Sequence, residues 1–438
     1  MKICIIGGGA GGRSASRGIR QLDKNIQIDL FSTQAEIGYA PCEPPFVLRG
    51  LVKWEDIFYS GDFFENNGIS VHLSTEVTEI DKINRCIIAG DKSYSYDKLI
   101  LSPGAIPSVP AIPGLDGKNE YTVSTNIADG RALEQVISKH TSAAVIGAGA
   151  IGIEMAMALM EKNYEKVYLL DMQDNILPAG LDEDIASIVE RAMKTKGLKL
   201  VMSANIKGVN GNSEVKRVIL DDDEIEAPFL LLATGAKPNV DLAKRSGINI
   251  GETGGILVNE FLQTNDPNIY AAGDCIENYD RIIGQKTRRL MVTTADRTGY
   301  IAGRNLVSGN STPYEGTLLT FAIEILGYQI GTVGFTEKIA KEKGLDTVSI
   351  AMTVPTTRVQ YGGRPFHFKL IADRKSKRLI GAQIVSEEKI RGIINEMALA
   401  IAEKTPVNRL TSIETPYSPA IGLDPLSGGL AKLLRKLE

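Results

Sequence analysis

An internal repeat constrains the fold of this 438-residue chain more than any other feature of its sequence. An apolar strand, a Gly-x-Gly-x-x-Gly turn and a helix occur over residues 2–22 and again over 143–162. Short alternating strands follow in each copy, and each copy closes with a second apolar strand and a glycine, Gly104 and Gly235. A strand, this turn and a helix in succession form the unit that binds a dinucleotide. The sequence therefore predicts an α/β fold with two Rossmann-like dinucleotide-binding domains.

The two glycine turns contain the first candidate binding residues. Their glycines allow a tight turn and close approach of a pyrophosphate, and the start of the following helix supplies N–H donors and positive potential. We expect nucleotide contacts from Gly7, Gly9, Ala10 and Gly12 in the first turn and from Gly147, Gly149, Ile151, Gly152 and Glu154 in the second.

The strand after the second turn indicates which nucleotide binds there. This strand, 166–170, ends in Asp171, which follows Gly147 by 24 residues. A carboxylate at this place accepts hydrogen bonds from a ribose 2′-hydroxyl and repels a 2′-phosphate. No arginine follows in Met172-Gln173-Asp174. We therefore expect NADH, with NADPH as the poorer cofactor.

The C-terminal part has a different pattern. From about residue 316 the chain has longer strands and hairpins, with apolar segments at 366–371 and 378–385 and a turn at 373–377. A helix is expected over about 388–404. Hairpins followed by a helix are typical of α+β structure, so we expect a third domain here.

Cys42 is the residue with the clearest implications for chemistry. It follows Gly12 by 30 residues, and no second cysteine lies close to it in sequence. Such a thiol can exchange electrons only through a bond to a group outside the chain, namely a small thiol, a sulfane sulfur or an oxygen. Pro44 and Pro45 predict that a helix begins directly after it, where the helix dipole favours a thiolate.

Composition narrows the classes of function. The chain is 43% hydrophobic and 23% charged, as in ordinary globular proteins. Its net charge of −4, without basic runs, argues against nucleic acid, and no apolar stretch is long enough to cross a bilayer. Cys4, Cys86 and Cys275 each lie alone in or near apolar segments, with neither a disulfide framework nor metal-ligand spacing. A cytoplasmic protein without a metal is expected.

These motifs, together with the segment Thr264-Asn265-Asp266-Pro267-Asn268-Ile269-Tyr270-Ala271-Ala272-Gly273-Asp274, resemble the pyridine nucleotide-disulfide oxidoreductases over essentially the whole chain. The resemblance implies FAD at the first turn, a nicotinamide nucleotide at the second, and Asp274 as a ligand of the flavin's ribityl chain. It also implies a homodimer formed by the C-terminal domain. The domains expected are an FAD-binding domain over 1–115 and 250–315, an NAD-binding domain over 116–249 and a dimerisation domain over 316–438. No sulfur-transfer domain is expected to follow.

Within that family, Cys42 and Ala10-Gly11-Gly12 resemble the branch of coenzyme A disulfide and polysulfide reductases. Val47 stands where paired-cysteine relatives carry the second thiol. Tyr361 and Tyr417 look like that branch's tyrosines that reach the other subunit's flavin and cysteine. The resemblance further implies FAD contacts from Ser32, Pro41, Cys42, Val77, Ser102 and Gly104, a contact to the nicotinamide nucleotide from Gly235, and substrate contacts from Ser14, Arg17, Arg20 and Tyr39.

The chain departs from that branch at several positions. Ser32 replaces an acidic residue, Gln21 replaces an arginine, and Gly362 replaces a proline, so the cysteine chemistry carries over more fully than coenzyme A binding. Arg13, Arg17 and Arg20 recur at helical spacing and form either a solvated stripe or a site for an anion such as the coenzyme A phosphates.

The reaction expected is reduction of a low-molecular-weight disulfide, persulfide or polysulfide. NADH would reduce FAD, two electrons would pass to a sulfur bonded to Cys42, and Tyr361 or Tyr417 would help protonate the thiol that leaves.

Two alternatives stay open. One is an NADH oxidase or peroxidase reducing O₂ or H₂O₂, although such enzymes carry a histidine where Ala10 stands. The other is a redox-sensing or electron-carrier-binding flavoprotein in which Cys42 is incidental.

Overall fold

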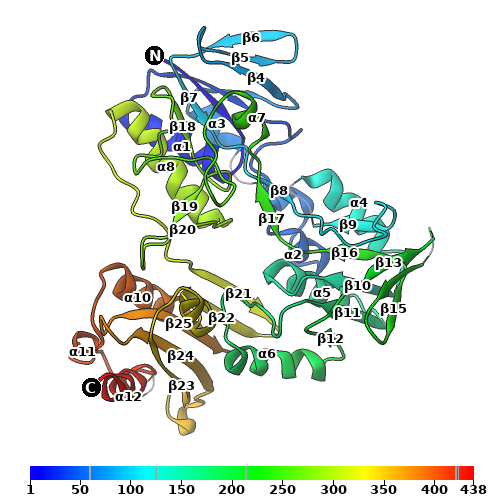
Figure 1. Ribbon diagram of the computed structural model, residues 1–438, viewed down its shortest axis with the longest axis vertical. Helices are drawn as coiled ribbons and strands as arrows, with labels where there is room; N and C mark the ends of the chain where they lie inside the picture. Colours follow the sequence, from blue (N-terminus) through cyan, green and yellow to red (C-terminus); the bar gives the residue numbers. More distant parts are fainter. Residues whose placement is uncertain (59–60, 124–125, 213–214, 420–421, 423) are drawn as a thin grey trace. The chain divides into compact units, whose positions relative to one another are not determined.

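The computed structural model describes residues 1–58, 61–123, 126–212, 215–419, 422 and 424–438 (Figure 1). The chain forms two compact units, and each copy of the repeat lies in a different one. The first unit comprises Met1–Ser108, Val123–Gln135 and Gly235–Thr317, and the second comprises Val109–Thr122, Val136–Thr234 and Leu318–Glu438.

The first unit is built on a parallel five-stranded sheet of order β18-β7-β1-β2-β3. Its strands consist largely of buried apolar residues, as expected for a parallel sheet whose two faces are covered. The strands are β1 (Lys2–Ile6), β2 (Gln27–Phe31), β3 (Ile69–His72), β7 (Lys98–Leu101) and β18 (Ile269–Ala271).

Two helices of this unit, α1 (Ala10–Leu22) and α8 (Val292–Ser308), pack closely against each other. Small residues permit the approach: a Cβ atom at Gly299 would collide with the carbonyl oxygen of Gly11, and one at Gly303 with that of Ala15. Helix α8 therefore fixes the position of α1, the helix that follows the first glycine turn.

The remaining elements of the first unit are shorter. An antiparallel sheet is formed by β4 (Val77–Asp81), β5 (Cys86–Ala89) and β6 (Lys92–Ser95). The helices are α2 (Pro44–Leu48), η1 (Trp54–Ile57), α3 (Gly61–Asn66), most of α4 (Ile127–Ile137) and α7 (Asp241–Arg245), and the other strand pairs are β8 (Ala105–Pro107) with β17 (Ala236–Pro238) and β19 (Asn278–Tyr279) with β20 (Lys286–Thr287).

The second unit repeats the architecture of the first. Its parallel sheet has the order β12-β11-β10-β16-β9, followed along the chain by an antiparallel sheet of order β13-β14-β15. The strands are β9 (Glu120–Thr122), β10 (Ser142–Ile146), β11 (Lys166–Leu170), β12 (Lys199–Val201), β13 (Gly208–Gly211), β14 (Lys216–Ile219), β15 (Glu224–Ala227) and β16 (Leu230–Leu232), and the helices are α5 (Ala150–Glu161) and α6 (Glu183–Thr195).

The C-terminal part of this unit is an antiparallel sheet of order β21-β22-β25-β24-β23 with short helices. The helix expected over 388–404 is α10. The elements are β21 (Phe321–Ile325), β22 (Tyr328–Gly334), α9 (Glu337–Glu342), β23 (Thr347–Pro355), η2 (Val359–Tyr361), β24 (Pro365–Asp373), β25 (Leu379–Ser386), α10 (Arg391–Ala402), α11 (Val407–Leu410) and α12 (Ser427–Leu437). The predicted fold class, two Rossmann-like units and a C-terminal α+β region, is confirmed.

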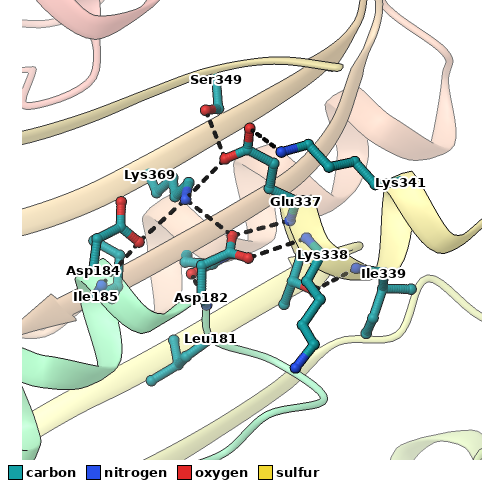
Figure 2. Close-up of polar contacts among 12 residues, drawn as sticks. Leu181, Asp182, Asp184, Ile185, Glu337, Lys338, Ile339, Lys341, Ser349 and Lys369 are labelled. Carbon is teal, nitrogen blue, oxygen red and sulfur yellow. Dashed lines mark hydrogen bonds and ion pairs between the residues drawn. The ribbon is translucent and has the colours of Figure 1, made fainter. Parts of the chain in front are cut away.

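A cluster of charged side chains around the buried Lys369 links the two parts of the second unit (Figure 2). The ammonium group of Lys369, on β24, lies 3.2 Å from a carboxylate oxygen of Asp182 and 3.1 Å from one of Asp184, at the start of α6. It also lies 3.1 Å from Glu337, on α9. Lys369 thus joins helix α6 to the C-terminal sheet.

Candidate functional site

The two glycine turns have nearly the same geometry. Gly7 and Gly147 adopt positive φ angles of 111° and 112°, which favour glycine. The Gly7 N–H donates to the Phe31 carbonyl oxygen at 2.8 Å, and the Gly147 N–H donates to that of Leu170 at 2.7 Å. The first glycine of each turn is therefore bonded to the end of the neighbouring strand, and the sequence repeat is a repeat in three dimensions.

The later glycines of each turn divide into packed and open positions. A Cβ atom at Gly12 or at Gly152 would collide with the carbonyl oxygen of the first glycine in its turn. A Cβ atom at Gly9 or at Gly149 would have no protein atom within 4 Å among the residues that the structure describes. The middle glycines therefore leave the space beside the helix start that a pyrophosphate requires.

The strands that follow the turns end differently. Asp171 accepts the Ala148 N–H at 2.6 Å and the Gln173 N–H at 2.8 Å, so its carboxylate is held at the second glycine turn. Ser32 occupies the matching place in the first unit, and its Oγ accepts the Gln34 N–H at 3.2 Å. The hydroxyl closes the same turn that the carboxylate closes, without the negative charge.

Asp274 has the geometry expected of a cofactor ligand. It follows β18, and its Oδ1 atom is buried without a hydrogen-bond partner among the described residues. Burial raises the pKa of this carboxyl to about 6, and a hydrogen bond from the backbone of Met291 acts in the opposite direction. A buried acceptor without a protein donor requires a donor from elsewhere. The hydroxyl groups of a ribityl chain would supply one, so the site fits FAD.

The other expected nucleotide residues lie in varied settings. The Ser102 N–H donates to the Ile6 carbonyl oxygen at 2.8 Å, and Ser102 is buried directly after β7. Val77 is buried in the core of the first unit. Gly104 and Gly235 have positive φ angles of 73° and 86°. Ile151 and Glu154 are half-buried on α5, Ala10 begins α1, and Pro41 is exposed beside Cys42.

Cys42 is exposed two residues before α2. Pro44 and Pro45 occupy the first positions of this helix, which confirms the predicted helix start. Val47, at the place of a second thiol in paired-cysteine relatives, is apolar and 7% exposed. By contrast, burial raises the pKa of the Cys4 thiol, and also that of Cys275, to about 12. Cys42 is thus an exposed thiol in the unit that contains the first glycine turn, whereas Cys4 and Cys275 are packing residues.

Tyr39 lies three residues before Cys42 with its ring buried. Its hydroxyl is buried and has no hydrogen-bond partner in the part of the chain that the structure describes. Burial, and to a smaller extent the charges of Asp129 and Cys42, raise the pKa of Tyr39. The hydroxyl therefore stays protonated at neutral pH and can donate a hydrogen bond.

Sequence reasoning missed the support of this segment by α4. The Trp54 Nε1–H donates to Glu134 Oε2 at 2.7 Å, and a Cβ atom at Gly130 would approach the Trp54 ring to 2.6 Å. Tyr39, Val47 and Trp54 share a small apolar cluster with Ile57 and Ile127. Trp54 is the single tryptophan of the chain, which is the one signal in the sequence that could have drawn attention to it.

The structure does not form the continuous arginine stripe that helical spacing predicted. Arg20 is buried and donates to the carbonyl oxygens of Asn67 at 2.7 Å, Ile26 at 2.6 Å and Gly68 at 3.2 Å. Its guanidinium therefore links α1 to the segments around Ile26 and Asn67 of the same chain and does not face a substrate.

The other members of that face contact α8. Ser14 donates to Asp296, and Arg17 lies 3.1 Å from the same carboxylate. The Arg17 guanidinium also lies over the Tyr300 ring, 5.4 Å from its centroid. Arg17 remains half-exposed, whereas Ser14 is buried. An anionic ligand at this face would have to compete with Asp296 for Arg17.

Tyr361 and Tyr417 lie on adjoining segments of the second unit. The Thr357 Oγ1–H donates to the Pro419 carbonyl oxygen at 3.1 Å, which joins the segment before Tyr361 to the segment after Tyr417. Both tyrosines are more than half exposed, at 53% and 54%. Exposed aromatic side chains on one part of a surface are typical of an interaction site.

Comparison with known proteins decides the family. The family model of pyridine nucleotide-disulphide oxidoreductases matches residues 1–299, and that of the family's dimerisation domain matches residues 322–422. The chain belongs to this family. It is therefore an NAD(P)H-dependent oxidoreductase of the flavin type, and its C-terminal domain indicates a homodimer. Among the residues described in Figure 1, no helix is both long and apolar enough to span a bilayer.

Several known proteins are similar to the chain over all or most of its length. An NADH oxidase of Methanocaldococcus jannaschii is 35% identical, with 100% of each chain covered. An NAD(P)H coenzyme A polysulfide/persulfide reductase of Pyrococcus horikoshii is 34% identical, over 92% of this chain and 91% of that one. The structure of an NAD-dependent persulfide reductase from A. fulgidus has a TM-score of 0.94 and 29% identity, covering 100% of this chain and 83% of that one.

Proposed function

We propose that the protein is an FAD-dependent NADH oxidoreductase that reduces a low-molecular-weight disulfide, persulfide or polysulfide through Cys42. The observation that carries this proposal is the exposed thiol of Cys42, with apolar Val47 in place of a second thiol. Tyr39, three residues before Cys42, adds a buried hydroxyl that has no hydrogen-bond partner among the described residues. Without an internal partner thiol, the sulfur that accepts electrons must come from a substrate. Relatives named as persulfide and sulfur reductases are consistent with this chemistry.

The cofactors follow from the two glycine turns. Bound FAD would relay two electrons from a nicotinamide to sulfur. We assign FAD to Gly7, Gly9, Ala10, Gly12, Ser32, Pro41, Cys42, Val77, Ser102, Gly104 and Asp274, and the nicotinamide nucleotide to Gly147, Gly149, Ile151, Gly152, Glu154, Asp171 and Gly235. The carboxylate of Asp171, held at the second turn, supports NADH over NADPH because it would repel a 2′-phosphate. A higher kcat/KM with NADPH would refute this preference.

The chemistry at sulfur can be written from the residues present. The Cys42 thiolate attacks one sulfur of a substrate R–S–S–R, which forms the bond Cys42–S–S–R and releases R–S⁻. Two electrons then cleave the mixed disulfide, so the net change is R–S–S–R plus two electrons and two protons to two R–SH. In this reaction the Tyr39 hydroxyl, which bonds none of the described residues in the structure, would donate a hydrogen bond to the sulfur of Cys42. Tyr361 and Tyr417 of the other subunit would protonate the leaving thiol.

The identity of the R group is a further part of the proposal. Coenzyme A is one candidate, and the half-exposed Arg17 would meet its phosphates. Mass spectrometry of the untreated protein tests this directly, because a mixed disulfide adds the mass of its thiol to Cys42. An adduct with the mass of coenzyme A or of added sulfur supports the proposal, and an oxygen adduct alone would favour a different acceptor.

An NADH oxidase is the second candidate, favoured by the relative of that name at 35% identity. It would cycle Cys42 through a sulfenic acid. Ala10, at the start of α1, offers no group to that sulfenic acid where the oxidases carry a histidine. Comparing NADH oxidation in air with NADH oxidation under argon plus a disulfide distinguishes the two: the proposed enzyme retains its activity under argon.

A further inference from the structure

The segment that follows Asp171, residues 172–181, is here called the ribose loop. Leu177, within this loop, is bonded to the second glycine turn. The Leu177 N–H donates to the Ala148 carbonyl oxygen at 2.9 Å, while the Ala148 N–H donates to Asp171. Leu177 has a φ of 50°, a left-handed conformation that leucine adopts only where the surrounding structure imposes it. The shape of the ribose loop and that of the turn are therefore linked.

The residue directly after the ribose loop is bonded to the C-terminal sheet. Asp182 is buried, and its N–H donates to Gln383 Oε1 at 2.9 Å, while Gln383 Nε2–H donates to Asp182 Oδ2 at 2.7 Å. The N–H groups of Glu337 and Lys338, at the start of α9, also donate to the Asp182 carboxylate, at 3.0 and 3.2 Å. The ammonium group of Lys369 is a further partner of the Asp182 carboxylate (Figure 2).

A second link lies near the start of the ribose loop. The Lys338 ammonium is 3.2 Å from the carboxylate of Asp174, and both side chains are about half exposed. A Cβ atom at Gly180 would collide with the Phe321 ring, so β21 also lies against the ribose loop. The C-terminal part of the unit thus contacts the ribose loop at Asp174 and Gly180, and also Asp182, the residue directly after the loop.

We propose that Gln383 and Lys369, in the dimerisation domain, are positioning residues for the nicotinamide nucleotide. They hold the ribose loop in the conformation that binds this nucleotide. The inference rests on the proposed binding of NADH at the second glycine turn. A loosened loop would have to be ordered when the nucleotide binds, and that ordering weakens binding. The chemistry at sulfur, which uses Cys42, would be unaffected.

The obvious substitution, removal of Lys369, would leave the buried carboxylate of Asp182 close to those of Asp184 and Glu337 without its ammonium partner, and it threatens folding. Gln383→Met avoids this because it removes both amide bonds to Asp182 without removing a charge. Glu337→Gln is the second variant, since this carboxylate is partly exposed and Lys369 keeps two others. Ile384→Val is the matched control: it weakens packing at the next residue of β25, on the opposite face of the sheet.

The test measures equilibrium binding of the redox-inert analogue 1,4,5,6-tetrahydro-NADH by calorimetry, together with amide hydrogen exchange of the ribose loop. We expect the Kd to rise about three- to tenfold in Gln383→Met and Glu337→Gln, with faster exchange over 172–181. Ile384→Val at a similar loss of Tm should leave both unchanged. The rate of flavin reduction at saturating NADH should stay within about twofold of wild type.

The possible outcomes separate this inference from the proposed function. An unchanged Kd in both folded variants, or the same rise in Ile384→Val, would overturn the positioning role while leaving the proposed function intact. Failure of the wild-type protein to bind the analogue would instead overturn the assignment of NADH to the second glycine turn.

Discussion

The proposed chemistry depends on a few side chains in the first unit. Cys42 exposes its thiol before α2. Tyr39, three residues earlier, has a buried hydroxyl without a hydrogen-bond partner in the described part of the chain. Asp274 likewise has a buried carboxylate oxygen that no described residue bonds. Unsatisfied buried polar atoms are rare in folded proteins and concentrate where a ligand completes the bonding. The Tyr39 and Asp274 atoms are consistent with the substrate and flavin sites proposed above.

Tyr39→Phe tests the role of that hydroxyl. We expect the variant to fold and bind FAD normally, to react more slowly with iodoacetamide at Cys42 at neutral pH, and to lose about tenfold or more in disulfide reduction. Because the pKa of Tyr39 is raised, its hydroxyl stays protonated and the loss should be constant from pH 6 to 9. Tyr270→Phe, a buried tyrosine bonded to Asn310, is the control. Equal alkylation and turnover in wild type and Tyr39→Phe would contradict the role.

Asp274 makes the stability of the flavin-free protein dependent on pH. Its pKa in the folded state, about 6, lies above the ordinary 3.8, so folding favours the protonated form. Its contribution is fully present below about pH 4 and is lost as pH rises through 6, a change of up to about 3 kcal/mol. Asp274→Asn should remove this loss and weaken FAD binding. Parallel pH profiles of Tm for flavin-free wild type and variant would show that the carboxyl is not perturbed.

At the scale of elements, the sequence repeat predicted both parallel sheets because strand, turn and helix follow one another within a few residues. The start of α2 was predictable from Pro44 and Pro45 for the same local reason. The hydrogen bonds of the Arg20 guanidinium to backbone carbonyl groups were not predictable, because helical spacing identifies a face of the helix without showing which groups surround it. Nor was the cluster around Lys369, whose partners Asp182 and Glu337 are distant in sequence. Contacts of this kind are set by tertiary packing alone.

The close packing of α1 against α8 gives a prediction about elements. Gly299→Ala places a methyl group against the Gly11 carbonyl, so the helices must move apart at a cost of about 1–3 kcal/mol. Because α1 begins at the first glycine turn, FAD retention should fall as well. Gly392→Ala, on α10, is the control, because a Cβ atom there would have no described atom within 4 Å. It should leave thermal stability and FAD retention unchanged or slightly improved. Thermal unfolding and flavin content provide the two measurements.

At the scale of the whole molecule, the family assignment supplies a dimerisation domain with exposed Tyr361 and Tyr417. Mixing Cys42→Ser subunits with subunits carrying both Tyr361→Phe and Tyr417→Phe tests whether these tyrosines act on the partner. Each heterodimer contains one intact cysteine paired with intact tyrosines of the other chain. Activity absent from both parents should therefore partly return on mixing. Verified heterodimers that stay inactive would mean that the tyrosines serve their own subunit or none.

The central claim is that electrons leave the enzyme through the sulfur of Cys42. The most direct test is Cys42→Ser, with flavin reduction by NADH and disulfide or persulfide reduction measured on the same sample. The account predicts that FAD content and flavin reduction are retained, because they depend on the glycine turns and Asp274, while reduction of the sulfur substrate is lost. Reduction of that substrate at a rate near that of wild type would contradict the account.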